Sequence, residues 1–585
     1  MRKTKIICTI GPASESEEML KKMMLAGMNV ARLNFSHGAH EDHKIKIDRI
    51  KKLRAELNLP VAIMLDTKGP EIRTGKLESG SVELIAGNEI VLTTEEILGN
   101  EKRVSVTYAN LPKNLTKGNT LMLDDGLIEL MVKEVSGTEI VCEIVSGEIL
   151  KNSKSVNVPG VSIDMTYLSE KDKSDILFGI KNDVDFIALS FVRNAQDVKD
   201  VRWFMQTHGS QNIDIIAKIE NAEGVENISE IIGASNGIMI ARGDMGVEIP
   251  FEELPHIQKK LIESCVAAGK RVITATQMLE SMQSHPRPTR AEITDVANAI
   301  YDGTSAIMLS GETAAGKYPL KSLETMSKIA EETESHIDYR FFNRRFDRRK
   351  KSEASITDAI SDATCRAAQE LSATAIVAVT LNGSSARMIS KWRPDTPIIA
   401  ATPREKTYYK MALTWGVTPL LTEFMENAQE LFNEVIKKVE QHTFVKGGDI
   451  IVITGSTQKS LGATNTLQAH IVGNILLKGA GHGSKSVSGR VFVAKGEGPD
   501  FNNFSSGDIL VVSQTTNEIL QLMRQCSGII TEESESGSGI VPAGYALDIP
   551  VIADAKGATM IIKTGAMVKI DAKTGYVYNS SGNEE

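Results

Sequence analysis

Short apolar runs that end abruptly in polar or charged residues recur between residues 4 and 312, and segments with helical apolar spacing separate them. A short run that is apolar on both faces is typical of a strand buried in a parallel sheet, and its alternation with helices indicates βα units. The predicted strands cover residues 4–10, 28–38, 61–66, 185–191, 213–220, 237–244, 271–277 and 306–312.

Three of these strands precede a segment in which the alternation stops, and five follow it. A helix is predicted over residues 14–26, for example, because a serine and two glutamates stand at its start. Eight βα units with polar groups at the strand ends fit a (β/α)8 TIM barrel, whose active site lies at the carboxyl face of the strands. A doubly wound open sheet is the alternative, but no Gly-x-Gly-x-x-Gly follows the first strand.

Residues 71–162 interrupt the barrel pattern with short alternating strands separated by turn residues such as Asp125-Gly126 and Ser136-Gly137. This pattern predicts a compact all-β domain inserted after a strand's carboxyl end. Such an insertion lies over the catalytic face of a barrel, so we expect it to act as a lid.

A second α/β pattern follows over residues 354–472, then a glycine-rich run at 479–484 that indicates a linker, then a separate small domain. The predicted domains are the barrel (1–69 and 167–345), the inserted β-barrel lid (70–166), a C-terminal α/β regulatory domain (346–476), a linker (477–488) and an extra small domain of swivelling type (489–585).

Composition narrows the class of protein. Hydrophobic residues make up 41% of the 585 residues and charged residues 24%, as in ordinary globular proteins with a large core. The net charge of -9 argues against a general nucleic-acid binder. The five cysteines are scattered without metal-site spacing, which predicts free thiols and a cytoplasmic protein. We expect neither a signal peptide nor a membrane span.

Candidate chemistry gathers at the predicted strand ends. Lys218 and Glu220 are two residues apart on one strand and so share a face, and Asp244 closes the next strand. A lysine and two carboxylates at one rim could hold a hard divalent cation and an anionic substrate. A surface salt-bridge cluster is the plainer interpretation of the same three residues.

Other polar residues end the neighbouring predicted strands. The guanidinium of Arg32 suits a phosphate, and oxygen-bearing side chains beside it suit a hard cation, including a monovalent one. Arg73 stands at the entry to the lid, where it could clamp a phosphate, and Thr276 offers a hydroxyl at the seventh strand end. Together these residues predict metal-assisted phosphoryl transfer. The oxygen-bearing residues are Asn34, Ser36, Asp66 and Thr67.

Several longer motifs at these strand ends resemble signatures of the pyruvate kinase family. They are Asn34-Phe35-Ser36-His37-Gly38, the run from Leu65 to Arg73, Ile216-Ala217-Lys218-Ile219-Glu220-Asn221, Ala241-Arg242-Gly243-Asp244-Met245-Gly246 and the run from Ala275 to Met282. The likeness covers residues 1 to about 472, with the motifs in the family's order. It implies the barrel, the lid, a regulatory domain and a homotetramer.

The resemblance also implies roles for individual residues. Glu220 and Asp244 would ligate Mg2+, and Lys218 would contact the phosphoryl group as it moves from phosphoenolpyruvate to ADP. Arg32 would hold the phosphate, while Gly243, Asp244 and Thr276 would bind the substrate carboxylate. The nucleotide-binding residues would be Asn34, Phe35, Ser36, His37, Arg73 and Lys154, and the K+ ligands would be Asn34, Ser36, Asp66 and Thr67. A glutamate at position 71 goes with a K+ requirement in this family. The activity implied is the final step of glycolysis.

A loop after the strand at 375–380 predicts a site for an allosteric phosphate ligand, either AMP or a sugar phosphate. Such a turn, if it opens a helix, presents backbone N–H groups to a phosphate. A plain βα connection is the alternative. The candidate residues are Thr380, Asn382, Gly383, Ser384, Ser385 and Arg387.

Three other functions compete with this hypothesis. A Mg2+-dependent aldolase acting on pyruvate would also need Glu220 and Asp244, but it would not need a lid that carries basic residues to a nucleotide. A binding scaffold without catalysis would lack one or more of the polar residues at the predicted strand ends, and none of them is missing from the sequence. The basic cluster at 344–351 could bind RNA, although a solvated helix end fits the net negative charge better.

The final domain resembles the swivelling phosphohistidine domain of phosphoenolpyruvate-utilising enzymes. That domain needs a histidine at a helix start, because an imidazole nitrogen must accept the phosphoryl group. The corresponding stretch here, residues 537–543, has none, and no histidine follows His482. We therefore expect a structural module without carrier chemistry.

Overall fold

The computed structural model describes residues 2–580 except 211, 340–341, 343–354, 426–427, 443, 457–463, 474, 495–502 and 537–538. The basic cluster at 344–351 thus lies outside the described residues. The chain divides into two compact units. One comprises Met1–Asp362, Ala378–Leu421 and Ser460–Thr464, and the other comprises Ala363–Val377, Thr422–Lys459 and Asn465–Glu585.

The predicted barrel is confirmed: eight parallel strands close in the order β1-β16-β15-β14-β13-β12-β3-β2. These strands are buried almost throughout, which is why they appear in the sequence as mainly apolar runs. The strands are β1 Lys5–Thr9, β2 Val30–Asn34, β3 Ala62–Asp66, β12 Phe186–Leu189, β13 Asp214–Ile219, β14 Gly237–Ala241, β15 Arg271–Ala275 and β16 Ala306–Leu309.

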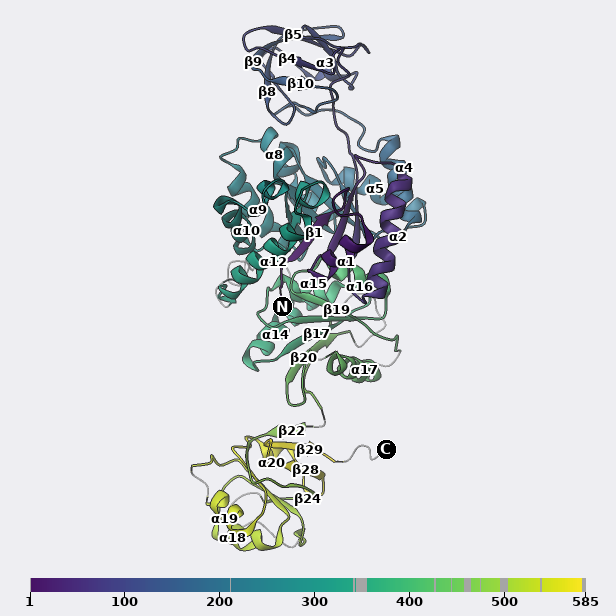
Figure 1. Cartoon of the computed structure of the whole chain (residues 1–585). Coiled ribbons are helices and arrows are strands. Elements are labelled where there is room, and N and C mark those ends of the chain that lie inside the picture. Colours follow the sequence, from purple (N-terminus) through teal and green to yellow (C-terminus); the bar gives the residue numbers. More distant parts are fainter. Residues whose placement is uncertain are drawn as a thin grey trace. The chain divides into compact units, whose positions relative to one another are not determined.

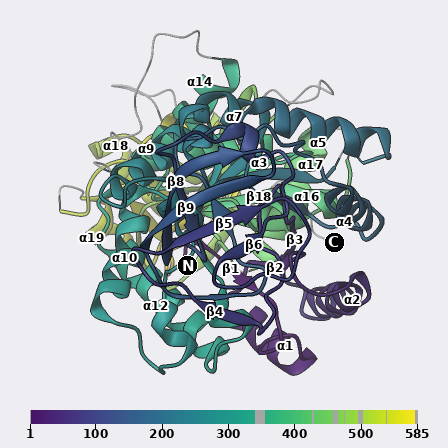
Figure 2. The ribbon, with the colours of Figure 1, turned by 90° about the horizontal axis from the view of Figure 1, so that it is seen from above.

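Alternate side chains of these strands form two cores. One set, including Ile7, Met64 and Ile216, fills the barrel, and Leu413 packs with it. The other set packs against the surrounding helices, several of which ring the strands when viewed from above (Figure 2). The helices are α1 Glu17–Leu25, α2 His40–Glu56, α4 Glu170–Lys181, α5 Ala195–Thr207, α6 Ala222–Glu226, α7 Ile228–Ala234, α8 Arg242–Glu248, α9 Leu254–Ala267, α10 Arg290–Asp302, α11 Gly311–Ala314 and α12 Pro319–Ser335, with the 3-10 turn η1 Glu280–Gln283.

The inserted segment is all-β apart from the short helix α3 Leu111–Asn114, as predicted (Figure 1). It contains a six-stranded sheet of order β11-β7-β8-β9-β5-β6 and a two-stranded sheet of β10 and β4, around its own apolar core. The strands are β4 Ser81–Glu83, β5 Glu89–Thr93, β6 Arg103–Ser105, β7 Thr120–Leu123, β8 Ile128–Ser136, β9 Glu139–Ser146, β10 Ile149–Lys151 and β11 Val156–Asn157.

The second α/β pattern is also present. In the first unit β18 Ile398–Thr402 pairs in parallel with β19 Val417–Leu421, and in the second unit β20 Ile450–Gly455 pairs antiparallel with β21 Thr466–Ile471. The other elements are α14 Ile356–Glu370, β17 Ala375–Val379, α15 Ser384–Lys391, α16 Glu405–Met411 and α17 Ala428–Gln441.

The end of the chain forms a sheet of order β22-β29-β28-β24-β25-β26-β27-β23. Alternate residues of its strands build two apolar cores. The elements are β22 Ile475–Lys478, β23 Ala480–His482, β24 Ser486–Ala494, β25 Ile509–Val512, α18 Asn517–Leu522, β26 Gly528–Thr531, α19 Ile540–Leu547, β27 Val551–Ala553, α20 Ala558–Ile561, β28 Met567–Asp571 and β29 Tyr576–Asn579.

The predicted linker at 477–488 is wrong, because β22, β23 and the start of β24 occupy it and belong to this sheet. Its glycines permit close backbone approach. A Cβ on Gly479 would lie 2.3 Å from the carbonyl oxygen of Ala553, and one on Gly481 would lie 2.1 Å from that of Ala572. A glycine in a strand often marks such a contact between backbones.

Candidate active site

Three charged side chains from neighbouring barrel strands meet at the carboxyl end of the barrel. The Asp66 carboxylate at the end of β3 lies 2.7 Å from Arg32 Nε and 3.2 Å from Lys218 Nζ. Asp66 is 1% exposed, so the triad is buried. Lys218 and Glu220, for which a surface salt-bridge cluster with Asp244 was the plainer interpretation, are also buried. Arg32, Asp66 and Lys218 come from β2, β3 and β13, and β12 lies between β3 and β13.

Each charged group of the triad stabilises the ionised form of its oppositely charged neighbours. Burial alone would raise the pKa of Asp66, but Arg32 and Lys218 outweigh it and lower that pKa below its usual range. Burial alone would lower the pKa of Lys218, but Asp66 and Glu220 outweigh it and raise that pKa above the ordinary lysine value. The charged ammonium form of Lys218 is therefore favoured, and Asp66, Glu220 and Ser190 hold it in position.

Two further carboxylates lie next to this triad. Glu220 Oε1 is 2.9 Å from Lys218 Nζ, and Glu220 Oε2 accepts the backbone N–H of Phe191 at 2.6 Å. Burial raises the pKa of Glu220 above its usual range, with Lys218 opposing the shift and Asp244 adding to it. Burial likewise raises the pKa of Asp244, which stands in the first turn of α8.

Paired buried carboxylates with raised pKa values are suited to a cation that can replace the missing proton. Among the described residues, no group of three or more His, Cys, Asp or Glu could hold a metal ion. Mg2+, however, commonly takes one or two carboxylates and completes its shell with waters and substrate oxygens. Glu220 and Asp244 therefore fit Mg2+ in donor type and number.

Thr276 directly follows β15, the seventh barrel strand in chain order, and forms a hydrogen bond with α8. Its hydroxyl accepts the backbone N–H of Gly243 at 2.8 Å and lies 2.6 Å from the carbonyl of Ala275. Thr276 has φ +68° and Gln277 has φ +53°, a region that is costly for residues with a Cβ. Arg242 stabilises this turn, because its Nη2 donates to the Thr276 carbonyl at 2.8 Å.

The four predicted K+ ligands lie on the neighbouring ends of β2 and β3. Asn34 and Asp66 are register partners, and the Asn34 side chain accepts the backbone N–H of Ser36 at 3.1 Å. Thr67 is buried, and its hydroxyl accepts the backbone N–H of Ser190 at 3.3 Å. Amide, hydroxyl and carboxylate oxygens are the donors that a hard monovalent cation needs, so the set fits in donor type.

Some predicted nucleotide-binding residues share one cavity. Ser36, His37 and Arg73 line a space of about 360 Å³, together with Lys68, Thr74, Thr107 and Ser153. Arg73 is already engaged there, because its Nε is 2.8 Å from Glu71 and its Nη1 donates to the Ser153 carbonyl at 2.8 Å.

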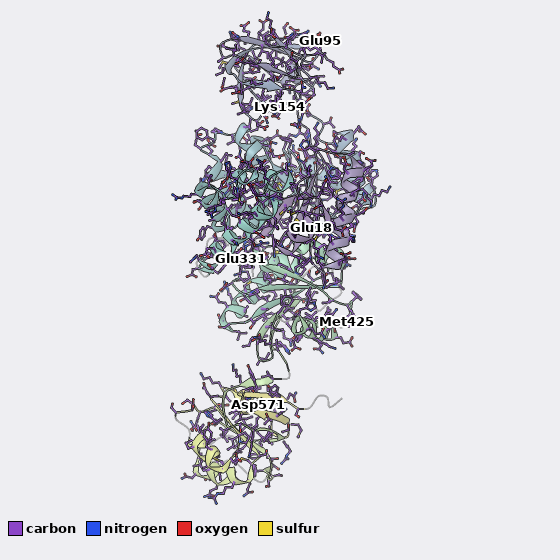
Figure 3. All side chains as sticks on the ribbon, viewed as in Figure 1. Glu18, Glu95, Lys154, Glu331, Met425 and Asp571 are labelled. Carbon is purple, nitrogen blue, oxygen red and sulfur yellow. The ribbon has the colours of Figure 1, made fainter. Side chains whose placement is uncertain are left out.

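Three other predicted nucleotide-binding residues, Asn34, Phe35 and Lys154, are not among those that line this cavity. The Phe35 side chain is 1% exposed and stacks on His43, with ring centroids 3.9 Å apart, so it belongs to the core. Lys154, labelled on the inserted domain in Figure 3, pairs with Asp124 at 2.7 Å.

The predicted effector loop has the expected strand, turn and helix, but its polar groups bond to one another. Gly383 has φ +81° and donates its N–H to Thr380 Oγ1 at 2.9 Å, and Ser384 N–H donates to Asn382 Oδ1 at 3.0 Å. The Arg387 guanidinium bonds the Asn382 carbonyl at 3.1 Å. Ser385 Oγ accepts the hydroxyl of Thr464 at 2.7 Å.

Sequence reasoning missed several residues of the rim. Ser190 accepts Lys218 Nζ at 2.7 Å and donates to the Thr67 carbonyl at 2.6 Å, and Thr9 accepts Arg32 Nη1 at 2.9 Å. Both residues end or directly follow a barrel strand, which is the signal that revealed the others. Lys68 follows the third strand in the same way.

The closed barrel, its all-β insertion and a rim of fixed cations beside paired carboxylates define a TIM-barrel enzyme that is suited to an anionic substrate. The pyruvate kinase barrel-domain model matches residues 1–323, and the pyruvate kinase alpha/beta-domain model matches residues 358–470. The chain belongs to the pyruvate kinase family, as its motifs indicated, and it is an enzyme, a kinase.

Relatives cover the whole chain. Pyruvate kinase of Sporosarcina psychrophila is 47% identical over 582 residues, which is 99% of both chains. Pyruvate kinase of Geobacillus stearothermophilus is 47% identical over 580 residues, 99% of this chain and 98% of the relative. The crystal structure of a pyruvate kinase from Cryptosporidium parvum superimposes with a TM-score of 0.77 at 38% identity, covering 80% of this chain and 96% of that one.

The final domain also matches a family model, that of the mobile domain of PEP-utilising enzymes, over residues 504–575. The predicted resemblance of this domain is thereby confirmed. The described part of the chain contains no helix that is both long and apolar enough to cross a membrane.

Proposed function

We propose that this chain transfers the phosphoryl group of phosphoenolpyruvate to ADP, giving pyruvate and ATP, with Mg2+ and K+ as cofactors. The observation that carries the proposal is the buried array of Arg32, Asp66, Lys218 and Glu220, beside Asp244. The names of the relatives add support. By the same likeness we propose the final step of glycolysis, a cytoplasmic location and a homotetramer.

Lys218 and Arg32 serve the anionic substrate in this proposal. Asp66, Glu220 and Ser190 hold the Lys218 ammonium in place before substrate arrives, so little reorganisation is needed when charge develops on the moving phosphoryl group. Arg32 donates a hydrogen bond from Nε to the Asp66 carboxylate and another from Nη1 to the Thr9 hydroxyl. The guanidinium is thereby oriented to bind the substrate phosphate.

Glu220 and Asp244 would hold Mg2+, which when bound supplies positive charge to the oxygens of the transferring group. The hydrogen bond from Gly243 N–H to Thr276 Oγ1 holds the start of α8 against the end of β15. In this proposal Gly243, Asp244 and Thr276 bind the substrate carboxylate. Thr276, with a water, places a proton on the enolate.

The direct test is a coupled assay of pyruvate formation from phosphoenolpyruvate and ADP. We expect turnover with Mg2+ and none after its removal by a chelator. A Mg2+-dependent aldolase, the alternative reading of the same carboxylates, would instead consume pyruvate in carbon–carbon bond formation without ADP.

We predict that activity requires K+. Asn34, Ser36, Asp66 and Thr67 offer oxygen donors next to Arg32, and Glu71 supplies no positive charge of its own. At constant ionic strength, exchanging K+ for tetramethylammonium should lower turnover by about tenfold or more. Full turnover in tetramethylammonium would rule out the cation site.

We also predict a nucleotide role for Lys68. Among the described residues its ammonium has no hydrogen-bond or ion-pair partner, whereas Arg73 in the same cavity pairs with Glu71. Lys68→Gln should raise the KM for ADP about tenfold, the effect of losing one charged hydrogen bond, and leave the KM for phosphoenolpyruvate unchanged. Lys76→Gln, an exposed lysine of the lid, is the control. Equal KM values for ADP in all three proteins would exclude the role.

Regulation by AMP or a sugar phosphate stays a proposal for the loop of Thr380, Asn382, Gly383, Ser384, Ser385 and Arg387. Hydroxyl and backbone donors gather there at the start of α15, but a phosphate would have to replace their present bonds. The phosphoenolpyruvate saturation curve, measured with and without each ligand, tests it.

For the final domain we propose a structural role without phosphoryl transfer. It contacts its neighbour within the second unit at one close approach, where a Cβ on Gly448 would lie 2.6 Å from the Tyr576 ring. We predict that ending the chain after Val472, before β22, lowers the thermal midpoint by about 5 °C and leaves kcat unchanged. A cut at residue 489 would instead divide β24. Loss of catalysis from a truncated protein that still folds would contradict this role.

A further inference from the structure

The returning segment of the lid, residues 156–165, bonds to two barrel helices next to the proposed metal ligands: α8, which contains Asp244, and α6, which follows Glu220. Glu248 at the end of α8 accepts the side-chain amide of Asn157 at 2.9 Å and the backbone N–H of Val158. Glu223 of α6 accepts the hydroxyl of Ser162 at 3.2 Å. The helix α8 begins two residues before Asp244, and α6 begins two residues after Glu220.

The lid's contact with α8 is more buried and involves more residues than its contact with α6. Glu248 is half-buried, and burial raises its pKa while the bonds from Asn157 and Val158 oppose the shift. A Cβ on Gly126 of the lid would lie 3.6 Å from Val247, so a second part of the lid also contacts this helix. Ser162 by contrast is exposed.

Asp244 and Glu248 are four residues apart on one short helix and therefore share a face, one turn apart. Both line a cavity of about 340 Å³, which Asn157 and Ser162 of the lid also line. The hydrogen bond from Asn157 to Glu248 thus connects the lid to the helix that carries Asp244.

We propose that Glu248 is a positioning residue that couples the place of the lid to the orientation of Asp244, with Asn157 and Val158 as its lid partners. The lid then acts on the metal site through a helix as well as by covering it. This inference rests on the proposed role of Asp244 in binding Mg2+. Groups that orient a metal ligand typically change metal affinity by 10–100-fold when removed.

The test is Mn2+ binding to the full-length protein without substrates, followed by electron paramagnetic resonance. Glu248→Ala should weaken Mn2+ binding about tenfold. Asn157→Ala should weaken it less, because the Val158 N–H remains, and the double variant should be no weaker than Glu248→Ala, since both changes break one contact. Glu248→Gln, which keeps an acceptor oxygen, should restore most of the affinity.

Ser162→Ala removes the exposed lid contact to α6 and is the matched control, with unchanged Mn2+ affinity expected. Unaltered Mn2+ binding in Glu248→Ala, or an Asn157→Ala effect of the same size with and without Glu248, would overturn the coupling. Asp244→Asn tests separately whether Asp244 binds the metal, and so distinguishes a failure of the coupling from a failure of the proposed function. If it too binds Mn2+ normally, the metal assignment itself is wrong and the coupling is wrong with it.

Discussion

Replacing Lys218 by Met is expected to lower kcat by about three orders of magnitude and to leave phosphoenolpyruvate binding nearly intact. The buried ammonium is held by Asp66 at 3.2 Å, Glu220 at 2.9 Å and Ser190 at 2.7 Å. A charge fixed in this way stabilises the transition state more than the ground state, because the negative charge that it meets develops during transfer.

Substrate binding survives in this prediction because Arg32 keeps its own contacts. Its bonds to Asp66 and Thr9 do not involve Lys218. Single-turnover kinetics and calorimetric titration of phosphoenolpyruvate in the presence of Mg2+ measure the two quantities separately. Lys173→Met, which removes a lysine paired with Glu170 on the surface of α4, is the control. Near-normal turnover of Lys218→Met would remove this residue from the mechanism.

The barrel could be predicted because the burial of each strand determines the residue types along that short segment of sequence. Strands covered on both faces are continuous apolar runs, and polar groups such as those of Asp66 and Glu220 are stabilised where a strand leaves the sheet. The convergence of Arg32 and Lys218 on Asp66 could not be predicted in the same way, because it depends on strand order. In the barrel β12 lies between β3 and β13, and Ser190, directly after β12, completes the network.

Phe35 shows a prediction that the sequence itself could have corrected. Arg32, Asn34 and Ser36 alternate and share one face, so Phe35 between them must face the opposite side. There it stacks on His43 in the core between strands and helices. A motif that is read as a unit overlooks this alternation.

The linker prediction failed for a different reason. A glycine-rich run has the same composition in a flexible linker and in a strand where backbones approach closely. At Gly479 and Gly481 the contacting backbones are those of Ala553 and Ala572, more than seventy residues later in the chain. Only the tertiary structure distinguishes these two cases.

A second large effect is expected at the opposite end of the barrel strands, where Asp214 begins β13. Its carboxylate lies 2.8 Å from Arg271 of β15 and 2.9 Å from Lys410 of α16. Burial alone would raise the pKa of Asp214, but Arg271 and Lys410 lower it to about 2. This carboxylate therefore links two barrel strands to a helix of the α/β domain.

The depressed pKa makes this part of the stability depend on pH. The unfolded chain protonates its aspartates near pH 3.9, so the stabilisation by Asp214 is fully present above that pH and is lost as the pH falls toward 2. The difference of about two pKa units corresponds to about 2.5 kcal/mol. Substitution also leaves Arg271 and Lys410 buried without their partner, which typically costs about 3–5 kcal/mol.

Asp214→Asn is therefore expected to destabilise the first unit by about 3 kcal/mol at pH 7 and to lose part of the acid-dependent limb of its unfolding. Urea denaturation followed by tryptophan emission at pH 7 and pH 4 measures both effects. The matched control is Asp183→Asn, which breaks the exposed pair of Asp183 with Lys406 of the same helix and should cost less than about 1 kcal/mol. Equal losses in the two variants would mean that burial does not strengthen the pairing of Asp214 with Arg271 and Lys410.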